Sequence, residues 1–207
     1  MCNDGSVADY YFASASDVTK RNVWVVWLQG GAWCNDEKSC ADRWAGAPGP
    51  QGSYMSSKGH PDTMRTLGVM GSKDPTLGGA NMAEVVFCTS DGHMGDRDGR
   101  KDTDAEASPS NGWHFRGQRV VRATLRDLVA TQGLAAGDTL VFGGCSAGGW
   151  GATAHCDWVK DFVPEGVKIS CLIDSPLWLL DVDSTSDGGH DPMSNEEATM
   201  DDFFIKL

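Results

Sequence analysis

Four short apolar runs along the chain limit the folds that it can adopt. They are "NVWVVWLQGG" (22 to 31), "AEVVFCTSDG" (83 to 92), "DTLVFGGCSAGG" (138 to 149) and "GVKISCLIDS" (166 to 175). Each combines β-branched or aromatic residues with an end in glycine or polar residues, which is typical of a buried strand followed by a turn. The four runs predict a mostly parallel sheet.

Helical patterns lie after the second and third runs. Residues 116 to 133 place Val121, Leu125 and Leu128 at i, i+4 and i+7 and end on Gly133, where a helix C-cap is expected. Residues 147 to 162 are rich in small residues that allow a helix to pack closely on a sheet. This order predicts a doubly wound α/β fold, whereas the Gly-, Pro- and Ser-rich residues 42 to 82 and 96 to 112 are expected to be irregular.

The third run contains a serine between glycines, in the order Gly144-Cys145-Ser146-Ala147-Gly148. A G-x-S-x-G between a strand and a helix is the nucleophile elbow of α/β hydrolases, a tight turn that requires small residues around the serine. The first N–H groups of the helix would face the point where negative charge develops in acyl transfer. A strand-to-helix turn without a catalytic role is the alternative.

A second glycine-containing turn could complete such a site. The segment "LQGGAWC" (28 to 34) follows the first run and could present the N–H groups of Gly31 and Ala32 to an oxyanion, together with that of Ala147. The two turns together predict an oxyanion hole beside Ser146.

Length and charge limit the class of protein and its partners. The 207 residues are enough for one α/β domain, and 17 Lys and Arg against 29 Asp and Glu give a formal net charge of −12. This charge argues against nucleic acid or an anionic membrane surface as partner. No apolar stretch reaches the length of a membrane span, and the first ten residues lack the pattern of a signal peptide.

The seven cysteines are dispersed and form no CxxC pair. Such a set is typical of disulfides in an oxidising compartment, rather than of a zinc ribbon or a thioredoxin-type motif. We therefore expect a protein of the secretory pathway whose natural amino terminus lies upstream of Met1. Because seven is odd, at least one thiol is free or pairs outside this stretch.

Six blocks of the sequence resemble a known family. They are "CNDGSVADYYF", "LQGGAWCNDEKSC", "VVFCTSDGHMGD", "FRGQRVVRATLRDL", "GGCSAGGWGATAHCD" and "VKISCLIDSPLWLLD". In this order, from about residue 2 to 181, they resemble the signature blocks of the pectin acetylesterase/Notum family of carbohydrate esterases. The GCSAGG, HCD and FRGQR forms look closer to plant-type pectin acetylesterases than to the Notum carboxylesterase branch.

The resemblance implies a secreted α/β-hydrolase fold and a serine-dependent hydrolysis of acyl esters, by default acetyl groups on a pectin-like polysaccharide, without metal or cofactor. It makes Ser146 the nucleophile and assigns the oxyanion hole to Gly31, Ala32 and Ala147. It also implies two disulfides, Cys2 with Cys88 and Cys34 with Cys40, and leaves open the pairing of Cys145, Cys156 and Cys171. The first disulfide would close a long loop, a contribution of roughly 4 to 5 kcal/mol.

Two positions depart from the family pattern. Gln29 stands where the family usually has a glutamate, which removes a charge near the site. Pro176 stands where the family tends to have a glycine, so the rim after the fourth run is expected to be reshaped.

The serine also needs a histidine base and an orienting acid. The resemblance implies that the family supplies both, as Asp and then His, from beyond residue 207. His155 follows Ser146 by nine positions, which places it on nearly the opposite helix face about 13 Å away, so we expect a packed or hydrogen-bonded histidine there. His190, with Asp174 or Asp181, is the one candidate late enough in the chain, and a solvent-exposed histidine is the alternative.

Further side chains are expected to border a pocket at the ends of the strands. The candidates are Trp33, Asp91, Trp150 and Asp174, joined by His93, His114, Trp113 and Trp178. Core packing is the alternative for each tryptophan.

Two acidic segments are expected to be solvated surface. Asp96, Asp98, Asp102 and Asp104 resemble a calcium loop only loosely, because Arg100 stands where a ligand should be, so no metal site is predicted. Residues 181 to 207 are expected to form an acidic surface segment.

Two hypotheses follow for a single, partial α/β-hydrolase domain over residues 1 to 207, with the sheet incomplete on its C-terminal side. The chain is either part of an active esterase, or a catalytically inactive pseudo-esterase that acts as a binding or structural subunit of an assembly. In the second case the elbow would persist because the fold needs its glycines. A domain that ended at residue 207 would expose a sheet edge, so we would then expect a protein partner to cover it.

Overall fold

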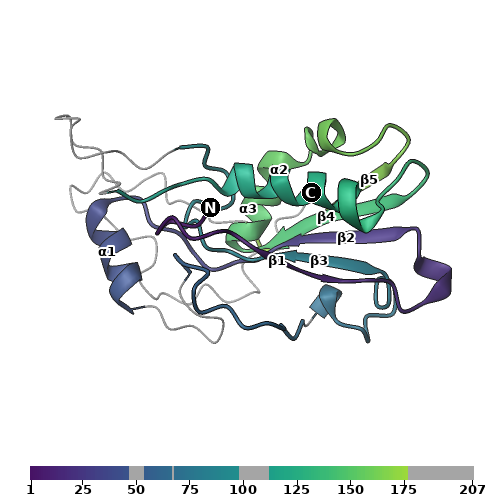
Figure 1. The fold of residues 1–207 in the computed structure, drawn as a ribbon, viewed down its shortest axis with the longest axis horizontal. Coiled ribbons are helices and arrows are strands. Elements are labelled where there is room, and N and C mark those ends of the chain that lie inside the picture. The colour runs from purple at the N-terminus through teal and green to yellow at the C-terminus, as the bar shows by residue number, and fades with distance from the viewer. Residues whose placement is uncertain (47–53, 67, 98–111, 177–207) are drawn as a thin grey trace, which may run out of the picture. The chain divides into compact units, whose positions relative to one another are not determined.

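A five-stranded sheet forms the centre of the molecule, with the strand order β1-β3-β2-β4-β5 (Figure 1). The computed structural model describes residues 1–46, 54–66, 68–97 and 112–176, which belong to one compact unit, Met1–Pro176. The strands are β1 Tyr10–Ala13, β2 Val23–Leu28, β3 Asn81–Val85, β4 Thr139–Cys145 and β5 Lys168–Asp174.

The prediction of a mostly parallel sheet is confirmed, because β2 to β5 pair in parallel. The additional strand β1 pairs antiparallel with β3 and was not predicted. The strand β3 begins and ends earlier than the run 83 to 92 and overlaps it only at residues 83 to 85, because the chain leaves the sheet after Val85 and turns toward the disulfide at Cys88.

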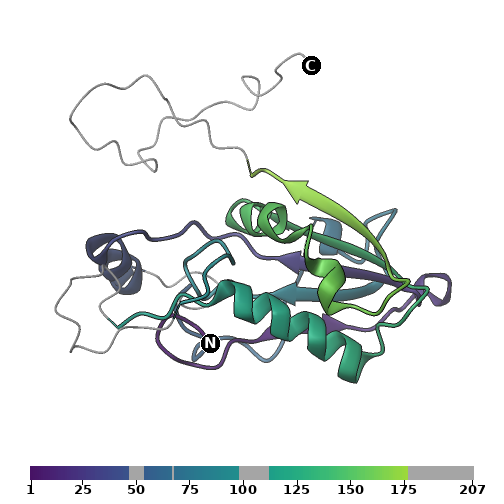
Figure 2. The ribbon, with the colours of Figure 1, turned by 90° about the horizontal axis from the view of Figure 1, so that it is seen from above.

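Both helices that pack on the sheet lie on the same face (Figures 1 and 2). Helix α2 spans Gly117–Asp127 and continues as a π-helical turn, η3, over Leu128–Gln132, after which Gly133 ends the segment with a φ of 96°. The predicted inward residues Val121, Leu125 and Leu128 are all fully buried. Helix α3 spans Ala147–His155, and the 3-10 turn η4 over Val159–Phe162 follows it.

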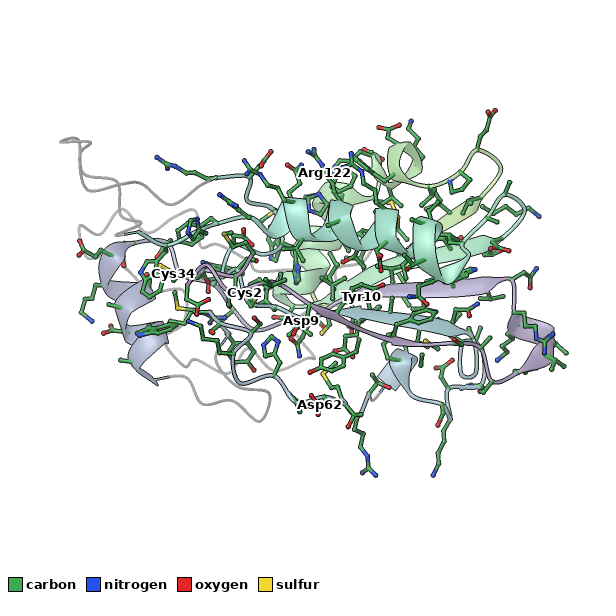
Figure 3. All side chains as sticks on the ribbon, in the orientation of Figure 1. Cys2, Asp9, Tyr10, Cys34, Asp62 and Arg122 are labelled. Carbon is green, nitrogen blue, oxygen red and sulfur yellow. A yellow bond between two sulfur atoms is a disulfide. The ribbon has the colours of Figure 1, made fainter. Side chains whose placement is uncertain are left out.

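Cation–π contacts join α2 to η4. The guanidinium carbon of Arg122, labelled in Figure 3, lies 5.4 Å from the ring centre of Trp158 and 5.3 Å from that of Phe162. Arg126, one turn further along α2, lies 5.3 Å from the Phe162 ring. These contacts hold the segment that follows α3 against α2.

The opposite face of the sheet packs against the loop that contains the 3-10 turn η2, Gly68–Met70. Val25 and Trp27 of β2 are buried there with Met70 and Met82. A cavity of about 600 Å³ opens beside this cluster, and its lining includes Tyr11, Asp62 and Glu84.

Helix α1, Glu37–Gly46, lies beyond the carboxyl ends of the parallel strands (Figures 1 and 2). The prediction that residues 42 to 82 are irregular is therefore wrong at both ends, since α1 runs to Gly46 and β3 begins at Asn81. Cys40 is the one buried residue of α1, so the helix carries no continuous apolar stripe that periodicity could reveal. The predicted acidic segment 181 to 207 lies outside the described residues.

Three disulfides brace the fold. Cys2–Cys88 and Cys34–Cys40 are the two pairs that the family resemblance implies, and Cys156–Cys171 joins the segment after α3 to β5. Cys145 is the free cysteine. Within the described part of the chain, none of the helices has the length and apolar character that a membrane crossing requires.

Candidate active site

Ser146 lies at a strained turn between β4 and α3. Its φ of 53° and ψ of −123° fall outside the regions that residues with a side chain readily adopt. The Ser146 N–H donates to the carbonyl of Asp174 at 3.0 Å, and the Ser146 carbonyl accepts the N–H of Trp150 at 3.1 Å. Both backbone groups of the serine are thus held, and its side chain is partly exposed.

The glycines around Ser146 are required by close backbone contacts. A Cβ at position 144 would lie 2.4 Å from the carbonyl oxygen of Gly148, and one at position 148 would lie 1.9 Å from that of Leu28. No larger residue fits either position without a shift of the backbone. The steric argument for the elbow therefore has a structural basis in this chain.

The loop after β2 lies directly against the elbow. A Cβ at Gly30 would lie 3.1 Å from Ser146 Cβ and 2.8 Å from the carbonyl oxygen of Cys145. The next two residues have positive φ angles, 149° at Gly31 and 55° at Ala32. Ala147 is the first residue of α3, so its N–H has no acceptor within the helix. The structure thus brings the loop of Gly31 and Ala32 to the same turn as Ser146 and Ala147.

Backbone strain is concentrated at one end of the sheet. The described non-glycine residues with positive φ follow the carboxyl ends of the parallel strands, and they are Ala32, Ser90, His93, Ser146 and Ser175. Ligands of open α/β folds bind at this end of the strands. Strain of this kind persists only where the surrounding structure enforces it, and it is common at functional sites.

A chain of hydrogen bonds connects the loops after β2 and β3 to helix α3. His93 Nε2 donates to the carbonyl of Gln29 at 2.8 Å, and His155 Nε2 donates to the carbonyl of His93 at 2.6 Å. The Gln29 side chain accepts the N–H of Phe87 at 2.9 Å through Oε1. Gln29 is therefore a buried neutral acceptor, where the family's glutamate would bury a charge.

His93 and His155 are both buried, and burial lowers the pKa of each. The pKa of His93 falls to about 4, so the ring is neutral at physiological pH and carries its proton on the nitrogen that donates to Gln29. The prediction that His155 is a packed, hydrogen-bonded residue is confirmed, and its ring also lies 4.4 Å from that of Trp158.

Arg43 of α1 contacts the Gly31–Ala32 loop and was not predicted. Its Nη2 donates to the carbonyl of Gly31, and its Nε donates to the Ser90 hydroxyl at 2.9 Å. The guanidinium carbon lies 4.9 Å from the ring centre of Tyr54 and 5.6 Å from that of Phe87. The helix that carries Arg43 has no periodic pattern, so the sequence contains no signal that marks this residue.

Asp91 organises the loop after β3. Its carboxylate accepts hydrogen bonds from the Thr89 hydroxyl at 2.6 Å and from three N–H groups, those of His93, Gly95 and Gly117, at 3.0, 3.2 and 2.8 Å. Gly117 is the first residue of α2, so Asp91 caps that helix from a distance. Burial raises the pKa of Asp91, and these hydrogen bonds oppose the rise.

The other predicted pocket residues lie around the same end of the sheet, but in different settings. Trp150 is 38% exposed on the first turns of α3, and the exposed Asp174 accepts the Ser175 hydroxyl at 2.8 Å. Trp33 is partly buried directly after Ala32. The ring of Trp113 lies tilted against that of Trp44 of α1, with 5.1 Å between the ring centres. His114 contacts the N-terminal segment, where its carbonyl accepts a hydrogen bond from the side chain of Asn3 at 2.7 Å.

The structure also contains a histidine–carboxylate pair that was not predicted. His60 Nδ1 lies 2.8 Å from an oxygen of Asp9, which Figure 3 labels. The pair adjoins β1, and the register places Tyr10, Val85, Leu28 and Gly144 in one row across the sheet. Three strand spacings of about 4.8 Å separate the ends of this row, so the pair is too far from Ser146 to act as its base.

No candidate metal site is present among the residues that the structure describes, where no group of three suitable side chains occurs. Asp96 forms an ion pair with Arg119. The remaining predicted residues lie outside the described ranges, and they are Asp98, Arg100, Asp102, Asp104, Trp178, Asp181 and His190.

Comparison with known proteins agrees with this geometry. The structure of the Wnt deacylase Notum from Drosophila superposes with a TM-score of 0.70 at 28% sequence identity, over 86% of this chain and 50% of that one. Pectin acetylesterase 11 of Arabidopsis thaliana is 31% identical over 188 residues, which are 89% of this chain and 44% of that protein. The palmitoleoyl-protein carboxylesterase Notum of Drosophila melanogaster is 31% identical over 187 residues, or 87% of this chain and 26% of that protein.

The mostly parallel sheet, the strained elbow serine and the Notum-like topology define a protein of the α/β-hydrolase class. A family model described as pectinacetylesterase matches residues 1–196. The chain belongs to the pectinacetylesterase family, and it spans less than half the length of these curated relatives.

Proposed function

We propose that this chain carries the nucleophile and the oxyanion hole of a serine esterase of the pectin acetylesterase type. The reaction is the hydrolysis of acyl esters, by family default acetyl groups on a polysaccharide or a similar carrier. The observation that supports it most directly is the contact of Gly30 with Ser146, because it places the Gly31–Ala32 loop beside the elbow serine.

In the proposed reaction, Ser146 Oγ attacks the ester carbonyl and the carbonyl oxygen becomes negative. The N–H groups of Gly31, Ala32 and Ala147 stabilise that oxygen. The bond from the carbonyl carbon to the alcohol oxygen of the carrier then breaks, and the serine proton passes through a base to the departing oxygen. Water releases the acid from the acyl-serine by the same steps.

The base and its acid are proposed to come from sequence that follows the described residues, in the family order Asp and then His. The settings of the described histidines support this assignment. His93 and His155 use Nε2 for backbone carbonyls, and His60 is paired with Asp9. His114 adjoins the N-terminal segment, where a Cβ at Gly5 would lie 3.7 Å from its ring.

We also propose that the protein works in an oxidising compartment. Three disulfides connect six of the seven cysteines, a density that is unusual for proteins of reducing compartments. Secretion agrees with a polysaccharide carrier, which lies outside the cell.

A fluorophosphonate probe tests the proposal on the protein as it is naturally produced. We expect the probe to label Ser146, as mapped by peptide mass spectrometry, and acetyl-ester hydrolysis to disappear in Ser146→Ala. Ser175→Ala is the matched control, because Ser175 also follows a parallel strand with a positive φ, 49°, and should leave labelling intact. Absence of labelling in the unmodified protein would contradict the esterase and favour an inactive binding subunit.

A further inference from the structure

The carbonyl groups of Gln29 and Gly31 flank the peptide unit between Gly30 and Gly31, and they are held from opposite parts of the fold. His93, in the loop after β3, donates to the carbonyl of Gln29, and Arg43, on α1, donates to that of Gly31. A peptide unit is planar and trans, so the N–H of a residue points opposite to the carbonyl of the residue before it. A contact that fixes the carbonyl therefore also fixes the direction of that N–H. Arg43 therefore sets the direction of the Ala32 N–H, and His93 sets that of the Gly30 N–H.

The Gly31 N–H belongs to the peptide unit between these two. With the units on both sides fixed, this central unit has little freedom to rotate. The N–H groups of Gly31 and Ala32 are the two donors that the loop contributes to the proposed oxyanion hole. The two contacts thus determine the orientation of both donors.

The setting of Arg43 suits a clamp. Two hydrogen bonds, to Gly31 and Ser90, fix the guanidinium plane, and the rings of Tyr54 and Phe87 lie within cation–π distance. The hydrogen-bond acceptors that the structure describes for this cation are neutral oxygens. Burial lowers the pKa of Arg43 to about 10, which leaves the side chain charged at neutral pH. A cation on the Gly31 carbonyl also polarises that peptide and strengthens its N–H as a donor.

The loop needs such a clamp because its backbone is strained. Ala32 has a φ of 55°, in the left-handed region that costs a residue with a side chain about 1 to 2 kcal/mol. Without an external contact, rotation of the Gly31–Ala32 peptide would relieve this cost and change the direction of the Ala32 N–H.

We infer that Arg43 and His93 are positioning residues of the oxyanion hole, which hold the Ala32 and Gly31 N–H groups toward the reacting carbonyl. This inference rests on the proposed function of Ser146. It assigns a role in the reaction to α1, a helix whose described residues belong to neither of the two apolar clusters on the sheet.

Substitution of Arg43 tests the inference in the protein as it is naturally produced. For Arg43→Met we expect kcat for p-nitrophenyl acetate to fall about 10- to 100-fold with KM changed less than twofold, because the oxyanion donors act in the transition state. The kcat of Arg43→Lys should lie between those of Arg43→Met and the unmodified protein, since an ammonium keeps the charge but lacks the planar arrangement of donors. Lys38→Met is the control, because it removes an exposed cation of the same helix that pairs only with Asp42 among the described residues.

A second measurement does not depend on activity. The ¹⁵N order parameter of the Ala32 amide should be near that of rigid backbone, about 0.85, and should fall below about 0.6 in Arg43→Met. His93→Leu should loosen the Gly30 amide in the same way, whereas His93→Gln keeps a donor and should preserve it. If Arg43→Met does not fold, Arg43→Lys gives both readouts.

The outcomes separate the two proposals. An unchanged order parameter at Ala32, or an unchanged kcat in a labelled and active protein, overturns the positioning role. A parallel rise in KM would also overturn it, because it would indicate loss of ordinary substrate binding. If Ser146 is neither labelled nor active in the unmodified protein, the proposed function fails, and the order parameter still decides whether Arg43 holds the loop.

Discussion

Gly148, in the first turn of the elbow helix, lies directly against the backbone of Leu28, so that a Cβ at position 148 would lie 1.9 Å from the Leu28 carbonyl oxygen. This contact joins the end of β2 to the start of α3 and sets the distance between the Gly31–Ala32 loop and Ser146. Because both partners are backbone, neither can move without displacing a strand or a helix. The elbow geometry therefore depends on the absence of a single methyl group.

Gly148→Ala is expected to destabilise the protein by more than about 3 kcal/mol, because the added methyl forces β2 and α3 apart. Urea unfolding followed by tryptophan fluorescence would measure the loss. Gly46→Ala is the matched helical control, since nothing lies within 4 Å of a Cβ there, and it should change the free energy of unfolding by less than about 1 kcal/mol. Equal effects of the two changes would contradict the steric account.

The lowered pKa of His93 predicts that the protein loses stability in acid. Its folded pKa of about 4 lies below the ordinary value of 6.5, so between these values the unfolded chain binds the proton and the folded one does not. This stabilising contribution is complete above pH 6.5 and is lost as the pH falls. Below pH 4 the total loss amounts to about 3 kcal/mol. Chemical unfolding of the wild type and of His93→Gln from pH 7 to 4 should show a shallower decline in the variant. Parallel curves would exclude His93 as the source.

The raised pKa of Glu84 predicts the opposite dependence of stability on pH. It lines the cavity on the sheet face opposite α2 and α3, and burial raises its pKa to about 7. The folded chain therefore binds the proton more tightly than the unfolded one from pH 4.5 to 7. The folded state thus loses stability as the pH rises through this window. Glu84→Gln, which stays neutral, should gain about 1 to 2 kcal/mol relative to the wild type between pH 5 and 8, less than the full shift implies because solvent reaches the cavity. A constant difference between the two proteins would contradict this.

Those parts of the fold that repeat a local pattern could be predicted from the sequence. The runs around Val25, Leu140 and Ile169 are short and mostly apolar, and the inward row Val121, Leu125 and Leu128 has helical spacing. The structure has strands and a helix there. Helix α1 lacks such a row, because it lies beyond the sheet and buries little besides Cys40.

The candidate site also contains residues that a local sequence pattern marks and residues that only the packing of the fold brings together. Ser146 and the Gly31–Ala32 loop lie in glycine-marked turns, whose sequence reflects the backbone directly. The contacts of Arg43 and His93 join residues that are 12 and 64 positions apart from the carbonyls they hold, and they depend on how α1 and two loops pack. No spacing rule connects such residues, so these roles become visible only in three dimensions.

The cysteines allow a direct chemical check. Six of the seven are paired, which leaves Cys145, the residue before Ser146, as the single thiol among them. Unfolding in denaturant without reductant should therefore allow one alkylation per chain, mapped to Cys145, and Cys145→Ala should allow none. Replacing both Cys156 and Cys171 by alanine should leave the number of alkylated thiols unchanged. It should lower the free energy of unfolding by about 3 kcal/mol, because the unfolded chain loses the restraint of a closed 15-residue loop. Alkylation at Cys156 or Cys171 in the unmodified protein would show that β5 is not tied to the elbow helix in this way.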